Sequence, residues 1–572
     1  MNTQKKTGYP SIDKPWMKWY EGCDLSYYPQ QTLFDNIWNN NKDNLNDIAL
    51  HYFGKKITYR ELFCMIHLAE LRLDELDIKF QDTVAFIGIY TPEMIALFYA
   101  LNKIGAISCI MDPRTAPESL AKYIQDARVK CLFIQDVCCE VAQKVLIHAE
   151  VAQTVVLSTS VSMGFPIKYL YSLKKKITTE KIQFMQYESI KLRDGGKNVK
   201  EEKRVDNVND VPAVVCYTGG TTGNSKGVLL SNGNLNSIVE QFRVMTGGFE
   251  RQQKWLSPSV PFITYFLNCS LHMPLAFGMQ CYIELYDNTK MKKRVKKQRI
   301  HHLAATPSFF EEFIKDSEDF SYIIMPTTGG DKLSERAYNQ INKQLEKGKC
   351  NWKICNGYGM TEVSSGACIS YKGKSNKANS VGIPLINTIV TAFDVETGEE
   401  VPIGKQGEIC ISGPGVMIGY LNNREATDEI IKVHHDRRWI HTGDIGYIDE
   451  DGCVFVTGRM KRMIIRFDGF KVFPSVVEEK MLTCHLIEDC SCVAMKDEQH
   501  DVGQVPIVFY TMSNTNVTCE FVEQELRKIS EELLPEYSQP YDYKMIDELP
   551  RTRAGKVDYR KLEEMQRENI IS

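Results

Sequence analysis

A dense glycine-rich loop, Tyr217-Thr-Gly-Gly-Thr-Thr-Gly-Asn-Ser-Lys-Gly227, is the feature that most constrains this chain. The apolar run at 211–216 before it is typical of a buried strand. Glycines let backbone amides approach a polyanion, hydroxyls add donors, and a lysine neutralises charge. The loop therefore predicts a phosphate-binding site, although many glycine-rich segments are merely flexible surface loops.

The residues after this loop separate it from the common nucleotide-binding P-loop. Lys226 is followed by Gly227, so the Gly-Lys-Ser/Thr order of a P-loop phosphohydrolase is missing. Downstream, Ser231 is a candidate helix cap and 235–244 has the pattern of a helix. We therefore expect a buried strand, a phosphate loop and a helix in close succession.

Length and charge set wide limits on the class of protein. At 572 residues the chain is too long for one core, so two or more domains are expected. A formal charge of −4 argues against a dedicated nucleic-acid binder. The 18 cysteines show no metal-ligand spacing, which favours reduced thiols and a cytoplasmic location.

The hydropathy of the sequence predicts neither a signal peptide nor a membrane-spanning segment. The amino terminus is polar and leads into no apolar signal region. No run of 18 apolar residues is present, so no transmembrane segment is predicted. Peripheral contact with a membrane stays open.

The order of candidate elements predicts an α/β fold. Strand-like runs at 82–88, 106–111, 131–134 and 154–157 alternate with helical patterns, which is typical of a doubly wound, largely parallel sheet. From residue 390 the pattern changes to antiparallel strands, with a hairpin turn at Asp451-Gly452. A smaller α+β unit follows residue 460. The lysine-rich run at 290–299 is typical of a solvated helix face.

Other motifs must be explained together with the glycine-rich loop. They are Asn356-Gly-Tyr-Gly-Met-Thr-Glu362, Trp439-Ile-His-Thr-Gly-Asp444, Gly458-Arg-Met-Lys461 with Gly469-Phe-Lys-Val-Phe-Pro474, and Leu549-Pro-Arg-Thr-Arg-Ala-Gly-Lys556. In this order they resemble the adenylate-forming superfamily of acyl-CoA synthetases, peptide-synthetase adenylation domains and beetle luciferases. The resemblance runs from about Thr58 to Lys556.

The resemblance implies an architecture and a reaction. Residues 1–460 would form an AMP-binding domain of doubly wound sheets with a β-barrel-like subdomain, and residues 461–572 a small mobile lid. A carboxylate would attack the α-phosphorus of Mg-ATP, giving an acyl-adenylate and pyrophosphate. A thiol, usually that of coenzyme A, would then displace AMP.

The resemblance also assigns roles to residues at the phosphates. Thr218, Thr221, Thr222 and Lys226 would grip the β- and γ-phosphates, with Gly219, Gly220 and Gly223 in the same loop. Thr361 would contact the α-phosphate, and Glu362 would hold Mg²⁺. Without the other motifs, the Thr-Glu pair would be an ordinary helix start.

The resemblance also assigns residues to the nucleoside site and to the lid. Tyr358 would stack on the adenine, opposite a wall of Gly329, Gly330 and Asp331. Asp444 would accept hydrogen bonds from the ribose hydroxyls, supported by Arg459. Lys556 would bridge the carboxylate and the α-phosphate, Lys461 would be the hinge of the lid, and Gly469 would face the thiolation tunnel.

Two features bear on the acid. Amino-acid-activating relatives place an Asp after the phosphate loop, whereas 261–268 has no acidic residue and an unpaired ammonium would be costly there. Short-chain enzymes often close the pocket with a Trp where this chain has Gly357. The pocket candidates, which could equally be core residues, are Phe262, Tyr265, Phe266, Asn356, Gly357 and Met360.

We therefore predict an ATP-dependent carboxylate–CoA ligase for a medium-to-long or bulky apolar acid. ATP, Mg²⁺ and coenzyme A are the expected cofactors. One alternative is an enzyme that loads the phosphopantetheine of an acyl-carrier protein. A second is a non-catalytic nucleotide-binding homologue.

Overall fold

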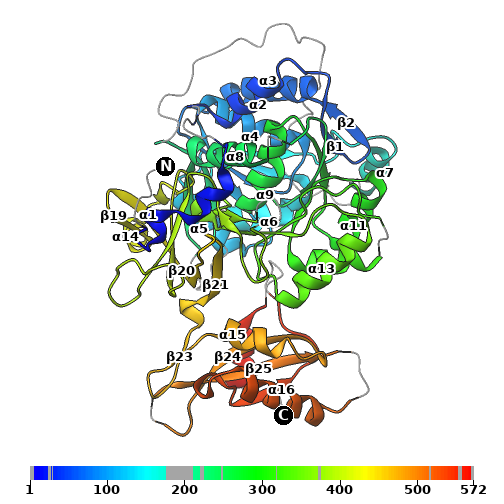
Figure 1. Cartoon of the computed structure of the whole chain (residues 1–572). Coiled ribbons are helices and arrows are strands. Elements are labelled where there is room, and N and C mark those ends of the chain that lie inside the picture. The colour runs from blue at the N-terminus through cyan, green and yellow to red at the C-terminus, as the bar shows by residue number, and fades with distance from the viewer. Residues whose placement is uncertain are drawn as a thin grey trace.

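The chain forms a large N-terminal domain and a smaller C-terminal domain, which lies at the bottom of Figure 1. The structure, a computed structural model, describes residues 6–23, 28, 30–175, 210–218, 225–246, 249–316, 319–370, 375–500, 502–513, 517–551 and 557–567. Among the helices of these segments, none has the length and apolarity needed to cross a bilayer.

A seven-stranded sheet forms the centre of the large domain, in the order β18-β8-β7-β4-β3-β5-β6. Neighbouring strands from β7 to β6 run parallel, as the alternating pattern predicts. The strands are β3 (Thr83–Ile87), β4 (Ile107–Met111), β5 (Cys131–Gln135), β6 (Gln153–Leu157), β7 (Pro212–Tyr217), β8 (Gly227–Ser231) and β18 (Gly419–Tyr420). The helices that connect or follow them include α4 (Pro92–Ile104), α5 (Pro117–Asp126), α6 (Cys139–Leu146) and α7 (Ile167–Lys175).

Helix boundaries follow local capping signals. The Thr58 side chain accepts a hydrogen bond from the Glu61 backbone N–H, and the Glu61 side chain accepts one from the Thr58 backbone N–H. Helix α3 (Tyr59–Glu75) therefore begins with a capping box. Helix α4 has Pro92 in its first turn and ends at Gly105, whose φ of 72° lies in the left-handed region.

The phosphate loop differs from expectation in one respect, because the chain turns back into a strand before the helix begins. β7 and β8 are antiparallel, with Tyr217 opposite Gly227, so the two ends of the loop lie on neighbouring strands. Helix α8 (Asn232–Thr246) starts after β8. The expected cap is confirmed: Ser231 N donates to Asn234 Oδ1 at 3.0 Å, and Asn234 N donates to Ser231 Oγ at 3.1 Å.

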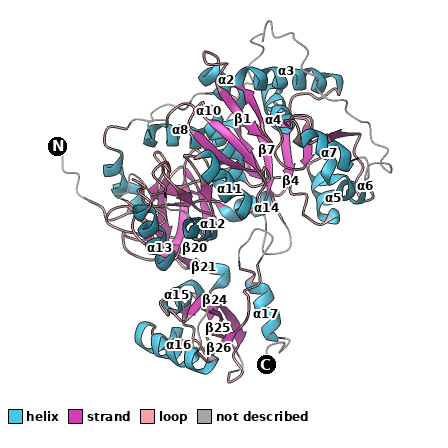
Figure 2. Cartoon of the chain, turned by 90° about the vertical axis from the view of Figure 1, so that its right-hand side faces the viewer, coloured by secondary structure: helices cyan, strands magenta, loops and turns pink. Residues whose placement is uncertain are grey.

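Two further sheets complete the α/β part of the large domain (Figure 2). One has the order β2-β1-β10-β9 and the other β11-β12-β13-β14-β15. The first consists of β1 (Ile48–Tyr52), β2 (Lys55–Thr58), β9 (Lys254–Pro258) and β10 (Gln280–Glu284). The second consists of β11 (Ala304–Ala305), β12 (Thr327–Thr328), β13 (Cys355–Tyr358), β14 (Cys368–Ile369) and β15 (Ile383–Pro384). Helices α2 (Leu33–Asn41), α11 (Asn288–Gln298), α12 (Pro307–Phe313) and α13 (Glu335–Lys347) also belong to the domain.

An antiparallel sheet forms the remaining part of the large domain. Its strands are β16 (Ile389–Phe393), β17 (Gly407–Ser412), β19 (Ile431–His434), β20 (Arg437–Ile448) and β21 (Val454–Arg459), with α14 (Arg424–Ile430) beside them. The N-terminal arm packs against the β20–β21 turn, where buried Trp16 lies next to Gly452, and the Tyr20 hydroxyl donates to Pro384 O on β15.

The C-terminal domain has hydrophobic clusters of its own, built only from residues after 463. Its three-stranded sheet has the order β24-β25-β26, and β22 pairs with β23 in a hairpin. Its strands are β22 (Ile464–Ile465), β23 (Lys471–Val472), β24 (Ile487–Lys496), β25 (Gln504–Met512) and β26 (Asp542–Met545), and its helices α15 (Pro474–Met481), α16 (Cys519–Leu533) and α17 (Tyr559–Arg567).

Candidate active site

Three motif residues meet where the antiparallel sheet adjoins β13. Asp444 on β20 is opposite Arg459 on β21, and Arg459 Nε lies 2.7 Å from Asp444 Oδ1. Tyr358, the last residue of β13, donates its hydroxyl to Asp444 Oδ2 at 2.6 Å. The fold thus joins residues that are 86 positions apart in the chain.

Burial controls the electrostatics of this group. Asp444 is only 3% exposed, so its charge needs the Arg459 guanidinium and the Tyr358 hydroxyl beside it. Burial, reinforced by the Asp444 charge, raises the pKa of Tyr358 well above its ordinary value. The phenol therefore stays protonated and donates to the carboxylate.

Side chains behind Asp444 fix the turn that carries it. Glu408 accepts from Gly443 N at 2.9 Å, and its second oxygen lies 2.7 Å from His441 Nδ1. Glu408, Cys410 and His441 are close enough together to hold a metal ion. Since both oxygens of Glu408 already have partners within the chain, we interpret the group as a brace for the Asp444 turn.

A second cluster forms around Glu362, which is buried in the short turn Thr361–Val363. The Tyr420 hydroxyl donates to Glu362 Oε1 at 2.8 Å, and the Lys226 ammonium lies 4.7 Å from the centre of the Tyr420 ring. Burial raises the pKa of Glu362, while the Tyr420 hydrogen bond and the charges of Arg459 and Lys226 oppose that shift. The two clusters therefore interact electrostatically through Arg459.

The ends of the phosphate loop are held together beside this cluster. Thr218 N donates to Lys226 O at 3.0 Å, and Lys226 N donates to Thr218 Oγ1 at 3.3 Å. Tyr420 on β18 pairs with Val228 on β8, which aligns the loop with Glu362. Gly219, Gly220, Thr221, Thr222 and Gly223 lie outside the described residues.

Close backbone approaches explain glycines in two of the motifs. A Cβ on Gly329 would lie 3.2 Å from Gly357 O, so the segments after β12 and within β13 touch. A Cβ on Gly359 would lie 2.0 Å from Ser365 O, so only glycine fits before Thr361. Gly330 has a φ of 83°, and Asp331 beside it is exposed.

The pocket candidates differ in their burial and in their hydrogen bonds. Phe262 and Phe266 are buried aromatics, and Tyr265 packs against Phe266 with ring centres 5.3 Å apart. Asn356, by contrast, uses its amide to donate to Ser380 O at 2.9 Å, as a structural residue would. Gly357 and Met360 are half-buried and flank Tyr358 in the chain.

The lid residues are spread over the small domain and its connection. Lys461 is exposed in the single turn Met460–Arg462 between β21 and β22. Gly469 lies in the exposed turn of the β22–β23 hairpin. Lys556 lies outside the described residues, but its flanking residues Arg551 and Val557 pair as a β-bridge.

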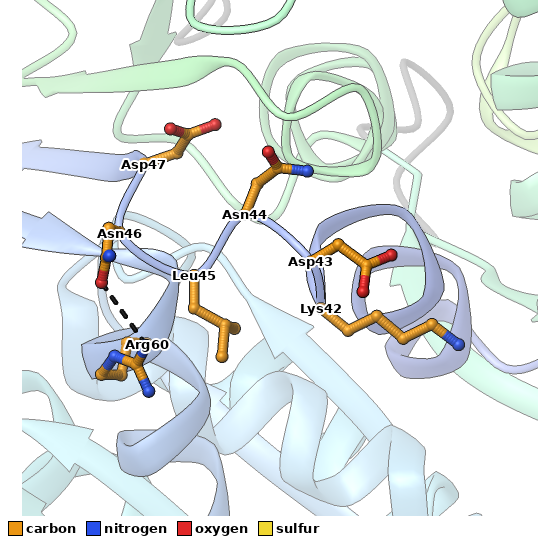
Figure 3. A pocket seen from close by; sticks show the side chains of 7 residues that line it. All are labelled: Lys42, Asp43, Asn44, Leu45, Asn46, Asp47 and Arg60. Carbon is orange, nitrogen blue, oxygen red and sulfur yellow. Dashed lines mark hydrogen bonds between the residues drawn. The ribbon is translucent and has the colours of Figure 1, made fainter.

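A surface hollow of about 290 Å³ occurs elsewhere, after α2 (Figure 3). The residues that line it are Lys42, Asp43, Asn44, Leu45, Asn46, Asp47 and Arg60. It contains none of the motif residues and is lined mainly by charged and amide side chains, so it is unsuited to an apolar acid.

Sequence reasoning missed Tyr420, Glu408 and His441. Tyr420 follows a Gly in Gly419-Tyr-Leu-Asn422, and His441 stands inside a motif quoted for Asp444. Neither position signals its partner, because the contacts of Tyr420 and His441 join residues 58 and 33 positions apart.

Comparison with known proteins agrees with this geometry. A sequence model of the AMP-binding enzyme family matches residues 37–421, and one of the AMP-binding enzyme C-terminal domain matches 476–556. The long-chain-fatty-acid–CoA ligase of Bacillus subtilis strain 168 is 25% identical over 97% of this chain and 99% of its own. The probable 4-coumarate–CoA ligase 2 of Dictyostelium discoideum is 29% identical over 78% of this chain and 79% of its own.

Solved structures share the fold. ATP-bound MatB from Rhodopseudomonas palustris aligns with a TM-score of 0.79 at 21% identity, covering 94% of this chain and 99% of its own. The anthranilate CoA ligase AuaEII with anthranoyl-AMP aligns with a TM-score of 0.77 at 17% identity, covering 95% and 98%. The chain therefore belongs to the AMP-binding, adenylate-forming enzyme family. Within that family it falls in the acyl-CoA synthetase branch, which includes the 4-coumarate–CoA ligases.

Proposed function

We propose that this protein is an ATP-dependent carboxylic acid–CoA ligase for a medium-to-long fatty acid or another bulky apolar acid. The observation that carries the proposal is the meeting of Tyr358, Asp444 and Arg459 beside the Glu362–Tyr420–Lys226 cluster. One group can hold a nucleoside and the other a polyphosphate, as an adenylation site requires.

The first group, formed by Tyr358, Asp444 and Arg459, would bind the nucleoside. Asp444 keeps lone pairs free for the ribose hydroxyls while Arg459 and Tyr358 fix its carboxylate. Tyr358 would stack on the adenine, and Gly329, Gly330 and Asp331 would form the facing wall. The close contact of Gly329 with the Gly357 carbonyl supports this narrow slot.

The second group, the Glu362–Tyr420–Lys226 cluster with the phosphate loop, would bind the phosphates. Lys226, Thr218 and the loop residues Gly219–Gly223 would neutralise and orient the β- and γ-phosphates, and Thr361 would contact the α-phosphate. Positioning and charge neutralisation supply most of the catalysis when one anion attacks another.

Glu362 fits the metal that such a reaction needs. Mg²⁺ prefers one or two carboxylates together with substrate phosphates and water, and Glu362 offers a hard oxygen ligand beside Lys226. Mg²⁺ held by Glu362 would supply positive charge at the phosphates of ATP.

The large domain would comprise residues 1–460 and the small domain residues 461–572. The small domain would act as a lid that rotates about Lys461. The charge of Tyr559, at the start of α17, is one of the influences that raise the pKa of Arg459, which supports a lid whose last helix lies on the side of the nucleoside group. The proximity supports delivery of Lys556 to the carboxylate and α-phosphate. Gly469 would face the thiol tunnel after rotation.

The acid would lie against Phe262, Tyr265 and Phe266. These aromatic side chains favour an apolar tail, and the segment 261–268 carries no carboxylate to pair with an amino acid. The names of the relatives, which include fatty-acid and 4-coumarate ligases, agree with an apolar acid.

The test is a pyrophosphate-release screen over fatty, aromatic and amino acids, with and without coenzyme A. We expect release with apolar acids, and acyl-CoA and AMP when coenzyme A is added. Transfer only to a phosphopantetheinylated carrier protein would establish the carrier-loading alternative. Absence of release and of pyrophosphate exchange with all acids would establish a non-catalytic nucleotide-binding homologue and reject the proposal.

A further inference from the structure

The N-terminal arm, residues 6–23, lies outside both matched family domains, the first of which begins at residue 37. Its first helix, α1 (Pro10–Asp13), is drawn in dark blue beside the antiparallel sheet (Figure 1). There Ile403 N donates to Gly8 O at 2.8 Å. The short helix Pro15–Tyr20 follows and makes the contacts that connect the arm to the candidate site.

One set of arm contacts is made with the turn between β20 and β21. Trp19 Nε1 donates to Asp451 O at 2.8 Å, and the Lys18 ammonium pairs with the Asp451 carboxylate. This turn closes the hairpin on which Asp444 lies opposite Arg459. Asp444 stands four residues before the end of β20, so roughly 13 Å of strand separates it from the turn. The arm therefore holds the far end of the hairpin that carries Asp444.

The next residue of the arm contacts the sheet that carries Tyr358. The Tyr20 side chain is 2% exposed, and its hydroxyl donates to Pro384 O at 2.5 Å. Pro384 on β15 is in register with Cys368 on β14, which is in register with Tyr358 on β13. Because neighbouring strands lie about 4.8 Å apart, the bound carbonyl is about 10 Å from the Tyr358 backbone.

The nucleoside group spans the same two sheets. Its central contact is the hydrogen bond of 2.6 Å from the Tyr358 hydroxyl to Asp444 Oδ2. A hydrogen bond weakens steeply as its angle departs from linear, so a tilt of one sheet against the other would disturb this contact. Trp19 and Tyr20 oppose such a tilt, because each binds one of the two sheets and the two residues are adjacent in the chain.

We propose that Trp19 and Tyr20 are positioning residues for the nucleotide, which set the orientation in which the two sheets of the nucleoside group meet. The inference rests on the proposed function, since it takes Tyr358 and Asp444 as the nucleoside site. Backbone hydrogen bonds between residues 381–382 and β21 also join the two sheets. Loss of the arm contacts should therefore loosen the nucleoside group without dismantling it.

Isothermal titration calorimetry of the full chain with ATP and with 2′-deoxy-ATP, in the absence of acid, tests the inference. The wild type should prefer ATP, because Asp444 is proposed to accept from both ribose hydroxyls. W19F/Y20F removes both donors of the arm and keeps an aromatic ring at each position. We expect its affinity for ATP to fall by about three- to ten-fold. The affinity for 2′-deoxy-ATP should fall less, so the preference for ATP narrows.

Two control variants separate positioning from stability. Tyr9→Phe, at an exposed tyrosine of the same arm, should keep the wild-type affinities for both nucleotides. Val145→Ala leaves a cavity in a hydrophobic cluster other than that of Tyr20, so it should lower the melting temperature and leave the preference for ATP unchanged. A preference that narrows equally in Val145→Ala and in W19F/Y20F would overturn the inference.

Failure of this inference differs from failure of the proposed function. Wild-type affinities in W19F/Y20F, or an equal loss for both nucleotides, would overturn the inference alone. ATP binding by the wild type without pyrophosphate release for any acid would reject the function alone, and no ATP binding by the wild type would overturn both. If W19F/Y20F does not fold, Trp19→Phe alone, at a half-buried side chain, decides by the same comparison.

Discussion

The candidate site has a floor, formed by Asp444, Glu362 and the tyrosines that hold them. This floor and the interface that connects the lid to the large domain are built in contrasting ways. Asp444 and Glu362 are 3% and 6% exposed and are held by hydrogen bonds from Tyr358 and Tyr420. The lid contacts the large domain through several polar contacts, among them the Lys332–Glu479 pair, whose side chains are 38% and 27% exposed.

The difference indicates which part is rigid. Buried, paired charges are costly to disturb, whereas an exposed pair contributes about 0–1 kcal/mol and is easily exchanged. A preorganised floor and a loosely held lid suit an enzyme whose proposed half-reactions need different lid positions.

Replacing the buried carboxylate of the floor should have the largest effect. Asp444→Ala removes the proposed ribose acceptor and leaves Arg459 without its partner, so we expect kcat/KM for ATP to fall by about 10²–10³. Pyrophosphate exchange measures this, with Asp428→Ala on the exposed helix α14 as control. Near wild-type exchange by the Asp444 variant would show that the floor is not the nucleotide site.

Restricting the hinge should affect one half-reaction more than the other. Lys461→Pro fixes one backbone angle in the turn Met460–Arg462 and should slow acyl transfer to coenzyme A by roughly ten-fold while largely sparing pyrophosphate release. Single-turnover measurements separate the two steps, with Lys461→Ala as control. Equal loss in both steps would argue against a hinge at this residue.

Removing one hydroxyl from the floor should give a smaller, pH-dependent effect. Tyr420→Phe loses a hydrogen bond to a charged group, so adenylation should slow by about ten-fold or less. That bond opposes the burial that raises the pKa of Glu362, so its loss should raise the pKa further and move the acidic limb of the pH–rate profile to higher pH. Tyr447→Phe, at a tyrosine stacked on Phe455, is the control. An unshifted profile would exclude coupling between Tyr420 and Glu362.

The exposed pair of the lid should matter least. Lys332→Ala removes a contact worth about 0–1 kcal/mol, so either half-reaction should change by no more than about five-fold. Rapid-quench rates of both steps measure this, with Lys343→Ala on helix α13 as control. A loss as large as that of Asp444→Ala would show that the lid interface, too, is preorganised.

Much of the fold was predictable because its signals are local. The capping box of Thr58 and Glu61, the stop at Gly105 and the alternation of strands and helices all act within a few residues. The turn back into β8 was not predicted, because three apolar residues, 228–230, are too few to distinguish a strand from the start of a helix.

The site was predictable only as far as its motifs reach. Tyr358, Glu362 and Asp444 stand in recognisable segments, and the Tyr358 hydroxyl donates to Asp444. Tyr420 and Glu408 act through hydrogen bonds to segments remote in sequence. The polar contacts of Lys332, Arg336 and Asn379 with the lid depend on domain orientation, which no local pattern encodes.

The most direct test compares the two half-reactions of Lys556→Ala. The proposed roles predict loss of acid-dependent pyrophosphate release by about 10²–10³, since a charge contact to the reacting groups is removed. Transfer from preformed acyl-AMP to coenzyme A should be largely retained. Equal loss of both half-reactions, or of neither, would contradict a lid that brings Lys556 to the nucleotide for adenylation alone.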